Sequence, residues 1–171
     1  MNATILLLAT LSIFRMGGDI RVDDAPNGAA LRTMGGDIRV VRGAGHIVAK
    51  TMGGNIEIAH LDGSAQASTM GGNVTVNVDG GRDLDLHSMG GEIEVTLPRG
   101  FSGAFDIELE EGDNGQRHEI KSDFPLQIRE SSRWRFFGGT RRLLTGAGRS
   151  GSGANRVKIT TIGGDITIRQ K

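Results

Sequence analysis

The chain contains no cysteine, which excludes a disulfide framework, a thiolate nucleophile and a thiolate metal site. Only three of its 171 residues are proline, so its 28 glycines do not belong to a collagen or a proline-rich linker. Neither sign of charge is in excess, since 20 Lys and Arg balance 20 Asp and Glu. A neutral chain has no general electrostatic attraction for nucleic acid, so we expect no nucleic-acid partner.

A hydrophobic run long enough to span a membrane is also missing. The apolar stretch near the start, residues 5–8, follows no Lys or Arg and precedes no small-x-small cleavage site. We expect residues 1–14 to form either an apolar cap on the fold or the remnant of a signal peptide.

A short unit recurs along the chain: methionine, two glycines, an acidic or amide residue, and then alternating apolar and polar residues. The methionines of this unit are Met16, Met34, Met52, Met70 and Met89, in steps of 18, 18, 18 and 19 residues. A related unit, "TIGGDITI", begins at Thr161. In the second copy, Ile38 and Val40 flank the polar Arg39. This alternation predicts a strand with one buried and one exposed face.

Each repeat carries a second strand, because apolar residues return at alternate positions after a turn, as at Ile47 and Ala49. The same residue types occupy the same columns in successive copies. This favours parallel stacking over a row of antiparallel hairpins, since like side chains then lie about 4.8 Å apart in ladders. Right-handed crossover is the default for parallel strands. We predict an all-β fold, a right-handed single-stranded parallel β-helix with coils of about 18 residues.

The residues around each methionine have a structural explanation. We expect the paired glycines at a corner that needs positive φ and close approach of backbones, with the methionine as an apolar plug. The residue after the glycines is expected to cap the turn by accepting a backbone N–H. This column contains Asp19, Asp37, Asn55, Asn73, Glu92 and Asp165. Calcium binding along it would need the denser GGxGxD pattern, which the chain lacks.

The repeat is predicted to occupy residues 15–97, to break at 98–153 and to return as a final coil at 154–171. Within the break, a strand through Ile107 and a second through Ile120 suggest a hairpin-like excursion. The glycine-rich stretch "SSRWRFFGGTRRLLTGAGRSGSG" suggests a long loop. Because a solenoid needs covered ends, we expect the hairpin or loop insertion and the N-terminal segment to be caps.

No residue pattern typical of catalysis is present. The four histidines have no metal-site spacing, and the chain has no Ser/His/Asp arrangement and no phosphate-binding loop. We therefore predict no catalytic, cofactor-binding or metal-binding residues, no cofactor, and a protein that is not an enzyme.

One stretch combines basic and aromatic side chains and is the predicted interaction surface. Its residues are Arg133, Trp134, Arg135, Phe136, Phe137, Arg141 and Arg142. Such a set can contact bases, an anionic glycan or a membrane surface. In the alternative interpretation, the aromatic residues seal the end of the β-helix while the arginines stay solvated.

The recurring Thr/Ser-x-Gly-Gly-Asp/Asn-Ile units, with "IKSDFPLQIRE" and the closing "TTIGGDITI", resemble the bacterial adhesin-like β-strand-repeat family, also called the toastrack domain. The resemblance covers nearly the whole chain after Arg15. It implies a non-enzymatic β-helical domain of the cell envelope, periplasmic or extracellular, and it supplies no catalytic residues.

Two classes of function follow. The first is an envelope-associated interaction scaffold that binds an envelope protein, a glycan or another copy of itself, with membrane contact as a further option. The second is a glycan-binding or glycan-cleaving β-helix protein, which would need an acid, a base and basic side chains gathered in one groove.

Overall fold

The computed structural model describes residues 10–80, 82–111, 117–135 and 139–171, with the strand residues 133–135, 139 and 140 described by their backbone alone. The described residues are all-β, as predicted, and contain fourteen strands and no helix. All fourteen strands belong to one sheet. No helix in this part of the chain is long and apolar enough to cross a membrane.

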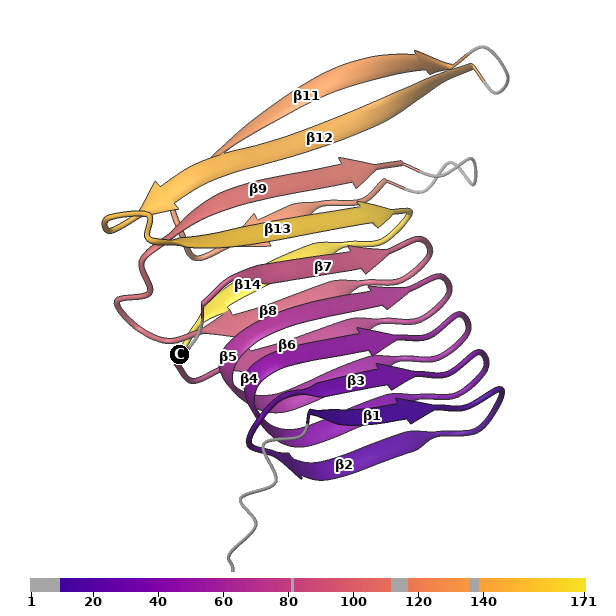
Figure 1. Cartoon of the computed structure of the whole chain (residues 1–171). Coiled ribbons are helices and arrows are strands. Elements are labelled where there is room, and N and C mark those ends of the chain that lie inside the picture. The colour runs from indigo at the N-terminus through magenta and orange to yellow at the C-terminus, as the bar shows by residue number, and fades with distance from the viewer. Residues whose placement is uncertain (1–9, 81, 112–116, 136–138) are drawn as a thin grey trace, which may run out of the picture.

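The sheet folds back on itself, so that its strands lie in two facing rows (Figure 1). One row contains β1 (Leu11–Phe14), β3 (Ala29–Arg32), the second halves of β4 (Ile38–Lys50) and β5 (Ile56–Thr69), β7 (Leu84–Ser88), β13 (Asn155–Ile162), β9 (Gly103–Glu110), β12 (Gly139–Ser150) and β11 (Leu126–Arg135). The other contains β2 (Ile20–Ala25), the first halves of β4 and β5, β6 (Val74–Val78), β8 (Ile93–Leu97), β14 (Ile166–Gln170) and β10 (Ile120–Ser122).

Successive repeats stack in parallel, which confirms that part of the prediction. Ile38 of β4 pairs with Ile56 of β5, one repeat later, and Ile56 pairs with Val74 of β6. These inward side chains are almost completely buried between the two rows. Burying each side chain of this size stabilises the fold by about 1.5–3 kcal/mol, so the columns supply the core.

The last repeat along the chain does not lie at the end of the stack. β13 pairs in parallel with β7 on one side and with β9 on the other, and β14 lies between β8 and β10. The predicted final coil at residues 154–171 is thus inserted between earlier parts of the chain. Insertion buries Val157 and Ile159 completely, because a strand covers each edge of β13.

The stretch predicted as a long loop forms most of an antiparallel hairpin. β11 pairs with β12, and β12 pairs antiparallel with β9, so the sheet is mixed rather than purely parallel. The predicted hairpin through Ile107 and Ile120 is also wrong, since β10 pairs with β14 instead. Glycine here marks close packing: a Cβ on Gly148 would lie 2.4 Å from the carbonyl oxygen of Pro125.

This hairpin lies at one end of the stack, with Leu143 and Leu144 buried. Near that end the ring of Phe105 lies 5.2 Å, between centroids, from the ring of Phe124. Of the N-terminal segment at residues 1–14, residues 1–9 lie outside the described part of the chain. Residues 11–14 form β1, which pairs with β3.

The corner of each repeat is held by close backbone contact. A Cβ on Gly54 would lie 2.1 Å from the carbonyl oxygen of Gly36, so the second glycine is required by space. The expected positive φ is wrong for most of these glycines, because among the paired ones only Gly18 and Gly163 show it. The expectation that methionine plugs the corner is wrong too, since the five described methionine residues are 44–77% exposed.

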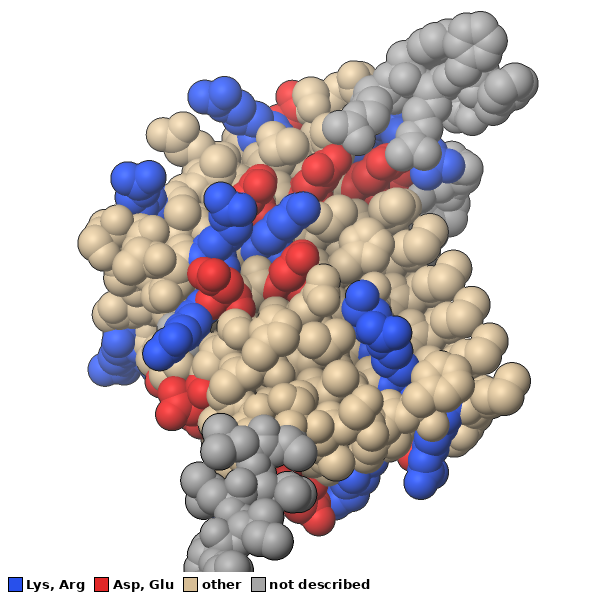
Figure 2. Space-filling view, viewed as in Figure 1, with Lys and Arg blue, Asp and Glu red and all other residues tan. Residues whose placement is uncertain are grey.

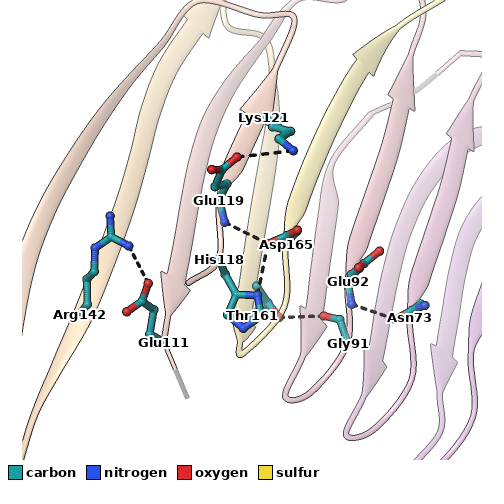
Figure 3. A network of polar contacts seen from close by, with 10 residues as sticks. All are labelled: Asn73, Gly91, Glu92, Glu111, His118, Glu119, Lys121, Arg142, Thr161 and Asp165. Atoms are coloured by element: carbon teal, nitrogen blue, oxygen red, sulfur yellow. Dashed lines mark hydrogen bonds and ion pairs between the residues drawn. The ribbon is translucent and has the colours of Figure 1, made fainter. Parts of the chain in front are cut away.

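Side chains at the corners connect one repeat to the next. Oδ1 of Asp37 accepts the backbone N–H of Asn55 at 2.7 Å, so the predicted cap acts on the following repeat. Thr51 is buried, and its hydroxyl donates to the carbonyl oxygen of Gly36 at 2.9 Å. Figure 3 shows both kinds of contact: Asn73 accepts the backbone N–H of Glu92 in the following repeat, and Thr161 of the inserted repeat donates to the carbonyl oxygen of Gly91.

Candidate functional site

An open groove of about 510 Å³ lies on the outer face of the row that contains β5, β7 and β13. Its polar and charged lining residues are His46, Ser64, Gln66, Asp83, Asp85, Arg156 and Lys158. The parallel register places Gln66, Asp85 and Lys158 side by side, because Asp85 pairs with each of the other two. Their neighbours along the strands point inward, so alternation sends these three side chains to the surface.

The groove alternates acidic and basic groups. Lys158 lies between Asp85 of β7 and Asp106 of β9 in the register. Figure 2 shows this mixture of acidic and basic side chains over the facing surface of the molecule. Asp85 and Lys158 are exposed, so salt screens their attraction and it adds little to stability. Their charges therefore remain available to a ligand.

Two other groups of the groove are held by hydrogen bonds. Oδ1 of Asp83 accepts the backbone N–H of Arg156 at 2.8 Å. Nδ1 of His46 lies 2.8 Å from the hydroxyl of Ser64 in the next repeat. Together the groove offers donors from Arg and Lys, acceptors from Asp, and both from Gln66, which suits a polar ligand.

Asp83 and Asp85 are two residues apart on one extended segment, so their Cα atoms are separated by roughly 6.6 Å. Hydrolysis of glycosidic bonds uses two carboxyl groups, about 5–5.5 Å apart in retaining enzymes and about 6.5–9.5 Å apart in inverting ones, measured between the carboxyl groups and not between Cα atoms. In this chain the Asp83 carboxylate is engaged with backbone while Asp85 is exposed. The groove therefore has one freely presented carboxylate beside two cations.

The structure places two residues of the predicted interaction surface in internal ion pairs. Arg142 donates from Nε to Glu130 and from Nη1 to Glu111, both at 2.6 Å, and its side chain is only 30% exposed. Figure 3 shows the Glu111 contact between β12 and the end of β9. The hydrogen bonds to Glu130 and Glu111 raise the pKa of Arg142, and the same bond from Arg142 lowers the pKa of Glu130.

Arg141 also turns back, with Nη1 at 3.5 Å from the buried Glu110. Arg141 and Arg142 are thus partly exposed, and their ion pairs tie the hairpin to the stack. In the register Arg133 pairs with Arg141, and Trp134 and Arg135 follow it in β11. The side chains of Arg133, Trp134 and Arg135, and Phe136 and Phe137 altogether, lie outside the described part of the structure, so their role stays a prediction.

His118 is the most buried of the ionisable groups on the second row. Its Nδ1 lies 3.2 Å from Oδ1 of Asp165, which also accepts the backbone N–H of Glu119 (Figure 3). Within the described residues, Nε2 of His118 has no hydrogen-bond partner. No group of three or more His, Cys, Asp or Glu in this part of the chain is arranged to hold a metal ion. His118 therefore acts as a contact between β10 and the corner before β14.

Sequence reasoning missed the groove because its two sides are far apart in the chain. Asp85 and Lys158 are neighbours only because the last repeat is inserted beside β7. A signal was present: Leu84 and Leu86 occupy the same columns as Val157 and Ile159, so the residues between them share a column as well.

Comparisons with known proteins find no matching family, no similar curated protein and no similar solved structure.

Proposed function

We propose that the protein is a non-enzymatic interaction scaffold of the cell envelope, and that it binds a polar partner, a glycan or an envelope protein, in the groove of β5, β7 and β13. The observation that carries this proposal is the alternation of Gln66, Asp85 and Lys158 across three paired strands. Paired strands on both sides hold these side chains in place. A ligand therefore binds a preorganised surface, and little conformational entropy is lost on binding.

The architecture we propose is a right-handed parallel β-helix capped by an antiparallel hairpin. The parallel register with an offset of 18 residues, as between Ile38 and Ile56, supports the helical path. The hand rests on the general preference of parallel strand connections. A rigid stack of this kind presents long flat faces, which are suited to binding a partner.

The location in the envelope rests on the resemblance to the toastrack domain. Self-association and contact with a membrane remain further options for the same scaffold. They differ from the groove proposal because neither of them requires Asp85 or Lys158.

The test is co-sedimentation of the purified protein with protein-stripped cell-wall sacculi and with envelope vesicles that retain their proteins. The groove variant carries Asp85→Asn and Lys158→Gln. The control carries Glu94→Gln and Arg169→Gln, which removes an exposed ion pair of 3.3 Å on the opposite row. We expect the groove variant to lose at least tenfold in binding and the control to match the wild type.

Binding to sacculi would identify a glycan ligand, and binding to vesicles alone would identify an envelope protein. Equal binding by the wild type and the groove variant, or sedimentation with neither material, would contradict the proposal.

A glycan-cleaving enzyme is the second candidate, because two carboxyl groups, those of Asp83 and Asp85, line the same groove. Cleavage needs one carboxyl group as acid and another as base or nucleophile. Assay of released sugar in the same tubes separates the two candidates: release by the wild type that Asp85→Asn abolishes would replace the scaffold with the enzyme.

A further inference from the structure

All described methionine residues occupy one exposed line on the molecule. Each follows the strand of the first row in its repeat, at the corners that form one edge of the stack at the right of Figure 1. These residues are Met16, Met34, Met52, Met70 and Met89. They are 44–77% exposed, although the inward columns beside them are completely buried. Packing of the core therefore does not account for them.

The backbone contacts show that these residues are stacked neighbours. A Cβ on Gly71 would lie 3.7 Å from the carbonyl oxygen of Met52, and a Cβ on Gly90 would lie 3.4 Å from that of Met70. Thr69 and Ser88, which precede Met70 and Met89, are paired in the strand register. Adjacent methionine residues are thus one strand spacing apart, about 4.8 Å.

That spacing suits a metal ion held between two sulfur atoms. Bonds between sulfur and a metal ion are about 2.3 Å long in zinc thiolates, so an ion held in line needs two sulfur atoms roughly 4.6 Å apart, which flexible methionine side chains on neighbouring strands can reach. Thioether sulfur is a soft ligand that selects Cu(I) among the biological metals. The chain has no cysteine to compete for such an ion.

Charged residues of both signs flank the column. Three residues after each methionine stands the acidic or amide column, with exposed carboxylates at Asp19, Asp37 and Glu92, while the exposed Arg15 and Arg32 precede Met16 and Met34. The selectivity of the column therefore rests on its sulfur atoms and not on its charge. The apolar methionine side chains then supply the soft ligands.

We propose that this methionine column binds Cu(I), and equally its analogue Ag(I), with each ion held by the thioethers of two successive repeats. No redox step is involved, since the ion binds and leaves as a monovalent cation. The site is separate from the polar groove and does not depend on the proposed scaffold function.

The number of methionine residues predicts how many ions the column can bind. Five described methionine residues provide two pairs, so the full chain is expected to take up about two ions. Ile162 occupies the position next to Met89 in the inserted repeat, because Thr161 pairs with Ser88. The substitution Ile162→Met therefore extends the column and is expected to raise the capacity to three pairs.

The experiment titrates the full chain with silver nitrate in chloride-free buffer by calorimetry, while NMR follows the methionine methyl groups labelled with ¹³C. A parallel titration uses Cu(I) under ascorbate with a chromophoric competitor. We expect the methyl resonances of Met52 and Met70 to shift. The variant Met52→Leu with Met70→Leu should lose at least tenfold in affinity or one bound ion.

Leucine keeps the apolar character and nearly the size of methionine, so the thermal unfolding midpoint of this variant serves as the control for folding. Oxidation of the exposed thioethers to sulfoxides with dilute peroxide should likewise abolish binding. Methyl resonances that do not move, an unchanged affinity in the leucine variant, an unchanged capacity in Ile162→Met, or equal affinity for Zn²⁺ would each overturn the proposal.

Discussion

The stacked repeats and the hairpin of β11 and β12 are joined in one sheet, yet they are held in different ways. In the stack, residues such as Ile58 are wholly buried, and neutral side chains such as Thr51 connect each repeat to the next. In the hairpin, Ile128 is 48% exposed, and the ion pairs of Arg141 and Arg142 add to the strand pairing of β12 with β9. The stack is therefore held by repeated, uncharged contacts, whereas charged side chains on one strand help to hold the hairpin.

Truncating one apolar side chain in each region should give the largest difference in stability between the stack and the hairpin. Ile58→Ala opens a cavity in a closed column and should lower the free energy of unfolding by about 2–5 kcal/mol. Ile128→Ala removes a half-exposed side chain and should cost less than about 1 kcal/mol. Urea unfolding monitored by circular dichroism measures both, and similar losses in the two variants would contradict the comparison.

The second prediction concerns the close backbone contact at Gly54, and the adjacent Gly53 is the control. Gly54→Ala places a Cβ 2.1 Å from a carbonyl oxygen of the previous repeat and should destabilise by roughly 2 kcal/mol or more. At Gly53 the nearest atom would be 3.9 Å away, so Gly53→Ala should change stability little. In the hairpin, a Cβ on Gly146 would meet Ile107 at 3.4 Å, and Gly146→Ala should fall between the two. Thermal unfolding midpoints give the order of stability of the three variants. A Gly54→Ala variant as stable as the wild type would show that the backbone at the corners can move to make room for a Cβ.

Acid should loosen the hairpin before the middle of the stack. The hydrogen bond from Arg142 lowers the pKa of Glu130 below its ordinary 4.5, so the stabilisation is present above that pH and is lost as the pH falls through the lowered pKa. The caps at Asn55 and Asn73 are amides and do not titrate. Hydrogen-exchange protection factors between pH 7 and pH 3 should therefore fall in β11 and β12 while β5 and β6 keep theirs.

Arg142→Gln should weaken the protection of the hairpin at pH 7 and remove most of its pH dependence. Lys121→Gln, which breaks an exposed ion pair of 3.5 Å with Glu119, is the matched control and should leave the hairpin as it is. A hairpin that loosens with acid in the Arg142→Gln variant as in the wild type would assign the effect to other groups.

Where residues recur in columns, the sequence predicts the structure well. The alternation around Ile38 and Ile56 predicts buried strands, and the repeat predicts parallel pairing between them. The column of Asp and Asn predicts caps, because a carboxylate or amide at a tight corner accepts the nearest backbone N–H. These features depend on local geometry and on contacts one repeat away.

The order of the repeats in space could not be predicted from the same columns. "TIGGDITI" at Thr161 matches every other copy, so its ladder residues fit beside any of them with similar energy. Its place between β7 and β9 depends on the chain in between, including the hairpin that β12 forms with β11. The groove between Asp85 and Lys158 could not be predicted either, because it exists only where those repeats meet.

The corner methionine residues were misplaced for a different reason. A residue at a bend belongs to neither face of the alternation, so hydrophobicity alone puts it inside. In the structure the inward space beside Met52 is already filled by Thr51, whose hydroxyl bonds to the neighbouring repeat.

The insertion of β13 and β14 also sets an order of events during synthesis. A ribosome makes β7, β9 and the hairpin before residues 155–170 exist, so the two parts of the stack must wait with facing strand edges unpaired. The segment made last, β13 and β14, then pairs with the strands on both sides of the gap. Chains caught at that stage would carry four open strand edges, on β7, β9, β8 and β10, and a repeat from a neighbouring nascent chain would fit any of them.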